Sequence, residues 1–528
     1  MARSAPTPRR RARRAADATA PGGPAADADL SVEEFRRLGK HAIDLLADYY
    51  ESVPDRPILP RIDDRRLRAT FGAPLPRRGA DPARVLDRWR DVVVPNVAHL
   101  TSPRFFGYVH GSGLRLAVLA DLLSVGSNPN VADRRISPGE SEIEATVVGW
   151  LARMIGYPAR SGGLLLGGGM AANYTAMQAA LRRHAGYDSA ADGLQRPRGG
   201  PRFTLYMSEE GHVTIPRASD LLNLGRNAVK VVPCRPDFAM DVGALREMID
   251  ADVRNGDRPF LVVGQAGSIN VGAVDPFRAI AAVCRERGLW FHVDGAAGGF
   301  GAMLPELRAK YAGLARADSV TVDPHKWLYL PKECGGLLVR DPNTLHRAFR
   351  LEADYLEAQA GRGDGARNYR SLGPESSRGF RALKVWMALQ HLGTEGYVRL
   401  FRQNLACVGR LDRRVRADPE FEALHVPTLY IYSFRYVPAD LSGTAGGDRR
   451  PSTQTYLDRL NAAIVDRVNR SGDVFLTTTR LRGVTALRVS ICNHRTTFAD
   501  VDRLFRSLKD AGRAVDRALR GSASRHRL

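Results

Sequence analysis

The sequence predicts an α/β protein with a larger domain built on a mostly parallel sheet and a smaller α+β domain after it. From about residue 140, short apolar runs such as FTLYMS, PFLVVG and LWFHVDG alternate with helical patterns such as FRAIAAVCRERG. The last section instead holds the strand-like runs TLYIYSFRYV and ALRVSICN beside long helical patterns. Strands that alternate with helices favour parallel pairing, because the crossover between parallel strands is usually a helix.

The length of 528 residues favours more than one domain. A helix is expected to begin at Ser31, because Glu34 stands in capping-box spacing to it. The polar, glycine-rich stretch Asp364–Ser377 indicates a mobile loop. Five parts are predicted in order: a disordered basic tail (1–30), a helical segment (31–100), a large domain (101–395), a small C-terminal domain (396–515) and a basic tail (516–528).

The chain carries a formal net charge of +21, with a run of arginines between Arg9 and Arg14. Such charge attracts polyanions, so a tail that binds nucleic acid or a membrane surface is one interpretation. A solvated tail without a specific nucleic-acid partner is favoured, since arginine is spread along the whole chain and no nucleic-acid-binding motif accompanies it.

The composition also bears on the compartment. No apolar run is long enough to span a membrane, and no apolar segment follows the arginine-rich start, so we expect neither a membrane span nor an export signal. The five cysteines are far apart and never form CxxC, which suits reduced thiols in a cytoplasm and argues against disulfides or a zinc site.

Four segments follow predicted strands, at the edge where open α/β sheets bind ligands. In GGLLLGGGMAANYTAM, Gly167 to Gly169 precede a helix, where backbone N–H groups can approach a phosphate. A tight turn between strand and helix would explain the same glycines. In FTLYMSEEGHV, His212 could stack on an aromatic cofactor or donate to a carboxylate, although a lone histidine is more often structural.

The other two segments carry an acid and an amine. In LWFHVDGAAGG, Asp294 ends an apolar strand, where a protonated ring nitrogen would be a suitable partner and a helix N-cap is the competing explanation. In SVTVDPHKWLYLPKECGG, Lys326 stands before Trp327 and Leu328, which argues against a surface lysine. A buried lysine with a lowered pKa can form a Schiff base with an aldehyde. Together the four segments supply the groups that hold pyridoxal 5′-phosphate.

On these residues the chain resembles the group II pyridoxal-phosphate-dependent amino-acid decarboxylases, which include the aromatic-amino-acid, histidine and glutamate decarboxylases. The resemblance extends from SPRFFGY to LRVSICNHRTTFADVDRL, and DPHKW with HVDGA upstream is its most specific part. It implies the fold-type I, aspartate aminotransferase-like architecture with a mostly parallel seven-stranded sheet. It also implies a homodimer with active sites at the subunit interface.

The resemblance assigns roles to particular residues. Lys326 would carry the internal aldimine, Asp294 would pair with the pyridine nitrogen, and His212 would stack on the ring. Four further residues would lie near the phosphate or the ring: Gly168, Gly169, Ser268 and His325.

The resemblance also bears on the reaction. Tyr355 in RLEADYLEAQ matches a tyrosine that the family links to protonation after loss of carbon dioxide. Relatives with phenylalanine there tend to form aldehydes with oxygen, so Tyr355 favours conversion of an L-amino acid to its amine and carbon dioxide. Two alternatives stay open: an aldehyde synthase, and a non-catalytic binding protein with the same fold. Asn130 and Ala132 fall where animal aromatic decarboxylases have bulky apolar residues, so the resemblance does not specify an aromatic substrate.

Overall fold

The computed structural model describes residues 29–60, 63–194, 200–350, 368–442 and 450–525. The chain forms two compact units. One comprises Met1–Ser52 with Asp63–Asn96, and the other comprises Val53–Ile62 with Val97–Leu528. The first unit is helical, and the second contains both sheets.

The helical unit begins where its capping residues predict. Ser31 Oγ accepts from the backbone N–H of Glu34 at 3.2 Å, and Glu34 Oε2 accepts from that of Ser31 at 3.1 Å. This reciprocal pair satisfies two backbone donors at the start of the first helix. Three helices are described in this unit, α1 (Val32–Ser52), α2 (Asp64–Phe71) and α3 (Pro82–Arg88), and a π-helical turn (Trp89–Val93) follows them.

The larger unit is built on a seven-stranded sheet with the strand order β1-β7-β6-β5-β4-β2-β3. Neighbouring strands pair in parallel except at β7, which is antiparallel to both β1 and β6. The apolar runs quoted above form β1, β2, β4, β5 and β6, and the mostly parallel sheet is confirmed. The strands are β1 (Gly162–Leu166), β2 (Phe203–Ser208), β3 (Val229–Val232), β4 (Arg258–Gln265), β5 (Trp290–Gly295), β6 (Ser319–Val322) and β7 (Gly335–Val339).

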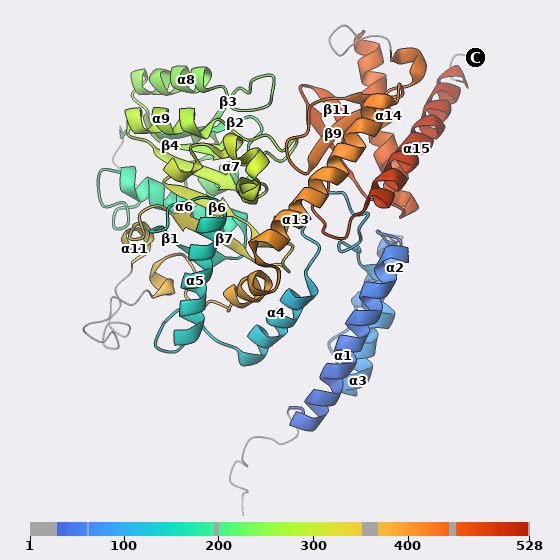
Figure 1. The fold of residues 1–528 in the computed structure, drawn as a ribbon, viewed down its shortest axis with the longest axis horizontal. Helices are drawn as coiled ribbons and strands as arrows, with labels where there is room; N and C mark the ends of the chain where they lie inside the picture. Colours follow the sequence, from blue (N-terminus) through green and yellow to red (C-terminus); the bar gives the residue numbers. More distant parts are fainter. Residues whose placement is uncertain (1–28, 61–62, 195–199, 351–367, 443–449, 526–528) are drawn as a thin grey trace, which may run out of the picture. The chain divides into compact units, whose positions relative to one another are not determined.

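Helices cover both faces of this sheet, as Figure 1 shows. Leu261 and Val263 of β4 lie in one apolar cluster with residues of the helices α6 and α7, whereas Val262 lies in the other with residues of α8 and α9. Because both faces are buried, the strands read as continuous apolar runs rather than alternating ones. The helices of this part are α4 (Arg115–Ser127), α5 (Pro138–Met154), α6 (Gly169–His184), α7 (Thr214–Leu221), α8 (Val242–Arg254), α9 (Phe277–Arg287), α10 (Pro324–Trp327) and α11 (Thr344–Phe349).

A second, antiparallel sheet follows in the order β10-β11-β9-β8. The long helix α13 (Ala382–Ala417) has a non-helical backbone at Gly393, where φ is 61°. A positive φ of this size favours glycine. This part also contains β8 (Phe421–Ala423), β9 (Ile431–Tyr436), α14 (Pro451–Ser471), β10 (Thr477–Leu481), β11 (Val484–Ser490) and α15 (Phe498–Arg525).

The structure bears on two further features, the stretch expected as a mobile loop and the presence of membrane-spanning helices. Residues 364–367 of the expected mobile loop lie outside the described residues, while Tyr369 and Leu372, which follow them, are buried. Among the described residues, no helix is both long and apolar enough to cross a membrane.

Candidate active site

The predicted cofactor residues gather at one edge of the large sheet, where β2, β5 and β6 end. His212 follows β2, Asp294 lies near the end of β5, and Lys326 lies in α10 just after β6. Together with Gly168 and Gly169 at the start of α6, these residues line a cavity of about 270 Å³. Carboxyl ends of parallel strands meet at a common edge, which is why residues far apart in the sequence converge here.

Asp294 is held in place by two donors. Asp294 is only 5% exposed. Oδ1 accepts from the backbone N–H of Ala296 at 3.1 Å, and Oδ2 accepts from Asn173 Nδ2 at 2.9 Å. Both carboxylate oxygens are thus held by fixed donors, and the side chain can serve a positively charged partner in the cavity.

Lys326 lies beside a second buried carboxylate. Its Nζ is 3.0 Å from Oδ2 of Asp323, whose side chain is 1% exposed. Burial lowers the pKa of Lys326, but the carboxylates of Asp323 and Asp294 outweigh that effect and raise the pKa above its ordinary value. The expectation of a lowered pKa, based on burial alone, is therefore wrong for the chain without cofactor. The neighbouring acids hold the amine as an ammonium ion.

His212 is half-buried, and burial lowers its pKa. Its Nδ1 accepts from the backbone N–H of Thr214 at 3.2 Å and lies 3.0 Å from Thr214 Oγ1. Because Nδ1 is an acceptor, the neutral ring carries its hydrogen on Nε2. The ring is thus fixed at one nitrogen and presents the other as a donor.

The glycines at the start of α6 permit close packing. A Cβ on Gly169 would lie 2.9 Å from Asp323 Oδ2 and 3.1 Å from Ala296 Cβ, and a Cβ on Gly168 would lie 3.1 Å from His325 Cε1. No side chain caps this helix. The first backbone N–H groups of any helix have no intrahelical acceptor, and here no side chain accepts from them either. Such a donor set can bind a phosphate at a helix N-terminus.

The remaining predicted residues differ in placement. His325 lines the cavity, and its Nδ1 lies 2.6 Å from the carbonyl oxygen of Cys334. Ser268 is buried but does not line the cavity, and its hydroxyl accepts from the backbone N–H of Ala273 at 3.1 Å. Tyr355 lies outside the described residues.

Three polar residues of the site were not singled out from the sequence. Asn173 donates to Asp294, and Asp323 lies beside the amine of Lys326. Arg488 of β11 is 4% exposed and donates from Nε to the carbonyl of the cavity-lining Ile269 at 2.8 Å. Its Nη2 has no hydrogen-bond partner among the described residues. The signal for Asp323 was available, since it stands three residues before the lysine in DPHKW.

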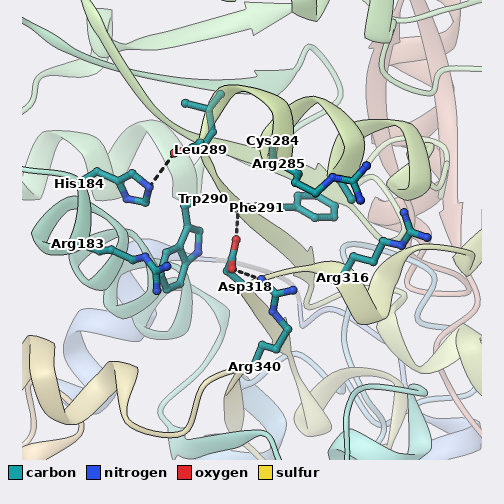
Figure 2. Close-up of a pocket in the computed structure, with 12 residues that line it drawn as sticks. Arg183, His184, Cys284, Arg285, Leu289, Trp290, Phe291, Arg316, Asp318 and Arg340 are labelled. Carbon is teal, nitrogen blue, oxygen red and sulfur yellow. Dashed lines mark hydrogen bonds and ion pairs between the residues drawn. The ribbon is translucent and has the colours of Figure 1, made fainter.

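A second cavity, of about 490 Å³, lies at the opposite edge of the sheet, where β5 and β6 begin. Figure 2 shows Arg340 pointing toward Asp318 and Arg183 beside the ring of Trp290. Its charged lining consists mainly of arginines, and none of the predicted cofactor residues belongs to it. The cavity that carries the predicted chemistry is the smaller one.

The smaller cavity fits pyridoxal 5′-phosphate. It offers an amine for the aldehyde, a fixed carboxylate for the ring nitrogen and an uncapped helix N-terminus for the phosphate. The seven-stranded sheet with this site defines a pyridoxal-phosphate enzyme of fold type I.

Comparison with known proteins identifies the family. Residues 65–437 match the family described as "Pyridoxal-dependent decarboxylase conserved domain". The chain is 29% identical over 480 residues to an aromatic-L-amino-acid decarboxylase of Bacillus atrophaeus, which covers 91% of this chain and 96% of the relative.

Two solved structures have a similar fold. A crystal structure of Oryza sativa TDC with PLP and tryptamine has a TM-score of 0.84 and 26% identity, covering 92% of this chain and 99% of that one. The crystal structure of Rhodiola rosea 4-hydroxyphenylacetaldehyde synthase has a TM-score of 0.81 and 25% identity, with coverage of 92% and 99%. The chain belongs to the pyridoxal-dependent decarboxylase family, is a carboxy-lyase by class, and has pyridoxal 5′-phosphate as its cofactor.

Proposed function

We propose that this protein converts an L-amino acid to its amine and carbon dioxide, with Lys326 as the residue that holds the cofactor. The observation that carries the proposal is the convergence of Lys326, Asp294 and His212 with the start of α6 in one cavity. Pyridoxal phosphate, when bound, supplies a ring that accepts the electron pair left by the departing carboxyl group.

The chain's own residues would orient and tune that ring. Lys326 would provide the amine for the aldehyde carbon, and Asp294 would accept a hydrogen bond from the protonated ring nitrogen. His212, fixed through Nδ1, would lie against the ring with Nε2–H as a donor. The backbone N–H groups of Gly169 and the next residues would hold the phosphate.

The substrate binds near a cation in this proposal. Arg488 is a buried guanidinium whose Nη2 is unpaired among the described residues, and burial lowers its pKa to about 10. A buried cation with a vacant donor suits an anionic group such as a carboxylate. The similarity to an aromatic-L-amino-acid decarboxylase makes aromatic amino acids the first substrates to test.

We also propose a homodimer with active sites shared between subunits, which acts in amino acid metabolism in the cytoplasm. The family resemblance supports the homodimer. The absence of CxxC from the sequence suits a reducing compartment. Neither a specific nucleic acid nor a membrane is expected as a partner. Domain boundaries near residues 100 and 395 remain part of this proposal.

The decisive experiment measures carbon dioxide release from a panel of L-amino acids by the purified protein with added pyridoxal 5′-phosphate. Release with stoichiometric amine supports the proposal. Cofactor binding without release from any amino acid would instead support the non-catalytic binding protein, and in that case deletion of residues 1–30 should remove its partner interaction.

One relative favours a second candidate. The similarity to Rhodiola rosea 4-hydroxyphenylacetaldehyde synthase supports an aldehyde product as the alternative. The two reactions differ in oxygen demand. Aldehyde formation would consume oxygen and release peroxide with each carbon dioxide, whereas amine formation, which we propose on account of Tyr355, would not.

A further inference from the structure

A chain of buried side chains leads from Asp294 along one face of the sheet, between β5, β6 and α6. Trp290 Nε1 is 2.9 Å from Ser319 Oγ, which is 2.8 Å from His292 Nδ1. His292 Nε2 is 3.0 Å from Asn173 Oδ1, and Asn173 Nδ2 is 2.9 Å from Asp294 Oδ2. Trp290, where the chain starts, lines the second cavity in Figure 2.

The hydrogen bonds of this chain can all be made in one direction. An indole nitrogen is a donor only, so Ser319 Oγ accepts from Trp290 and is able to give its own hydrogen to a neutral His292 at Nδ1. His292 then carries its remaining hydrogen on Nε2. Burial lowers its pKa to about 4, which is consistent with a neutral ring.

The direction continues through Asn173. Its Oδ1 accepts from His292 Nε2 and also from Thr321 Oγ1, at 2.7 Å. With the oxygen fixed on that side, the amide must present Nδ2 to Asp294. A flipped amide would place its oxygen against the carboxylate and would point Nδ2 hydrogens toward the Nε2–H of His292.

Asn173 also reaches the second cofactor residue. Its Nδ2 donates to Thr214 Oγ1 at 3.1 Å, and Thr214 in turn holds Nδ1 of His212. One amide group, 1% exposed, therefore supports both Asp294 and His212.

We propose that Asn173 is the positioning residue of the cofactor site: directed by His292 and Thr321, its amide donates to Asp294 and so orients that carboxylate toward the cavity, and through Thr214 it fixes the orientation of His212. This inference rests on the proposed function, because it assigns Asp294 to the cofactor's ring nitrogen. A role in packing alone would not require a particular direction of hydrogen bonds.

The charged and titratable groups that face Asp294 come from three elements. They are His212 before α7, His292 on β5, and Lys326 on α10 together with Asp323 directly before it. Every variant below retains Lys326, so the electrostatic influence of Lys326 on Asp294 is the same in each of them. The variable is the donor that Asn173 supplies.

The experiment measures the dissociation constant of pyridoxal 5′-phosphate for the full-length apoprotein from about pH 5 to about pH 9, by quenching of tryptophan fluorescence. Asn173→Leu removes a donor to the Asp294 carboxylate, so the acid side of the binding curve should move to higher pH than in the wild type. A hydrogen bond to a charged group is worth about one pKa unit, so the acid side of the binding curve should move up by about one pH unit.

Asn461→Leu is the matched control. Asn461 is also fully buried, and its amide accepts from the backbone N–H of Tyr436 and donates to the carbonyl of that residue. Loss of this asparagine should reduce stability without moving the pH dependence of cofactor binding. An equal shift in both variants, or no shift in Asn173→Leu, overturns the inference.

A second pair of variants covers the case in which Asn173→Leu does not fold. His292→Gln keeps a donor toward Asn173, and His292→Met removes it. We expect the acid side of the curve to shift in the methionine variant and to return toward the wild type in the glutamine variant. Identical curves would overturn the inference. If the wild type binds no pyridoxal 5′-phosphate at any pH, the proposed function fails instead.

Discussion

The strongest structural prediction concerns a buried ion pair that holds β1 in place. Arg378 and Glu144 have side chains that are 1% and 0% exposed. Arg378 Nη2 donates to Glu144 Oε1 at 2.6 Å and to the carbonyl of Leu165 at 2.7 Å, while Nη1 donates to Glu144 Oε2 at 3.1 Å and to the carbonyl of Val131 at 2.9 Å. The pair therefore joins α5 to the strand that leads into α6.

Arg378→Met would leave the Glu144 carboxylate buried with the backbone N–H of Leu165 as its remaining donor. Removing one partner of a buried pair costs about 3–5 kcal/mol, because the other charge is left uncompensated. A hydrophobic double replacement would not restore stability here, since the carbonyls of Val131 and Leu165 would also lose their donors. The matched control is Arg381→Met, whose partner Glu375 is 26% exposed and can be solvated, so we expect a cost of about 1 kcal/mol or less.

Urea unfolding of the apoprotein, followed by fluorescence, gives the free energy of unfolding for both variants. The reasoning is refuted if Arg378→Met costs no more than Arg381→Met. A loss confined to cofactor affinity, with an unchanged unfolding midpoint, would also contradict it, because the pair is assigned here to the stability of the fold.

Three other predictions test the site directly. Lys326→Ala should abolish the adduct that borohydride traps between protein and cofactor, whereas the exposed Lys332→Ala should retain it; mass spectrometry of the reduced protein locates the adduct, and one found on Lys332 contradicts the assignment. His292 has a folded pKa of about 4 against an unfolded value near 6.5, so its stabilising contribution is present above about pH 6.5 and is lost as the pH falls toward 4, by about 3 kcal/mol in total. Unfolding of His292→Gln across that range should show a smaller loss than the wild type, and equal slopes would disprove it. Tyr355→Phe should raise oxygen consumption per carbon dioxide released, measured with an oxygen electrode, and an unchanged ratio would show that Tyr355 does not select the product.

The fold of the large sheet was predictable because its strands are buried on both faces. A strand such as β6, SVTV, is apolar or hydroxyl-bearing throughout and fully buried, so it stands out in the sequence as a compact run. The capping residues Ser31 and Glu34 likewise specify a helix start from local chemistry alone. These signals are local, and the structure confirms them.

The cofactor residues were predictable only where they directly follow such a strand. Asp294 and Lys326 stand at or just past strand ends, so the sequence places them at the ligand-binding edge. Asn173 lies within α6, and its contact with Asp294 depends on which face of that helix meets β5. No sequence spacing specifies that face, because the residues around Asn173 are small on several sides.

The direction in which the pKa of Lys326 shifts could not be predicted from the sequence, for a different reason. Burial is visible in the sequence, through Trp327 and Leu328, but the compensating charges depend on three-dimensional placement. Asp294 is remote in sequence, and Asp323 is near in sequence but contacts Lys326 Nζ only because α10 turns them to the same side. A prediction from burial alone therefore gave the wrong direction.

The two carboxylates beside Lys326 differ in their hydrogen bonds, and this difference separates their roles. Both oxygens of Asp294 accept from fixed donors, whereas Oδ1 of Asp323 has no hydrogen-bond partner among the described residues and Oδ2 lies near Lys326 Nζ. An amine must lose its proton before it attacks an aldehyde. Asp323, whose Oδ2 lies 3.0 Å from Lys326 Nζ, is the nearer acceptor for that proton. Asp294, whose two oxygens already accept from Asn173 and Ala296, would then serve the protonated ring nitrogen alone.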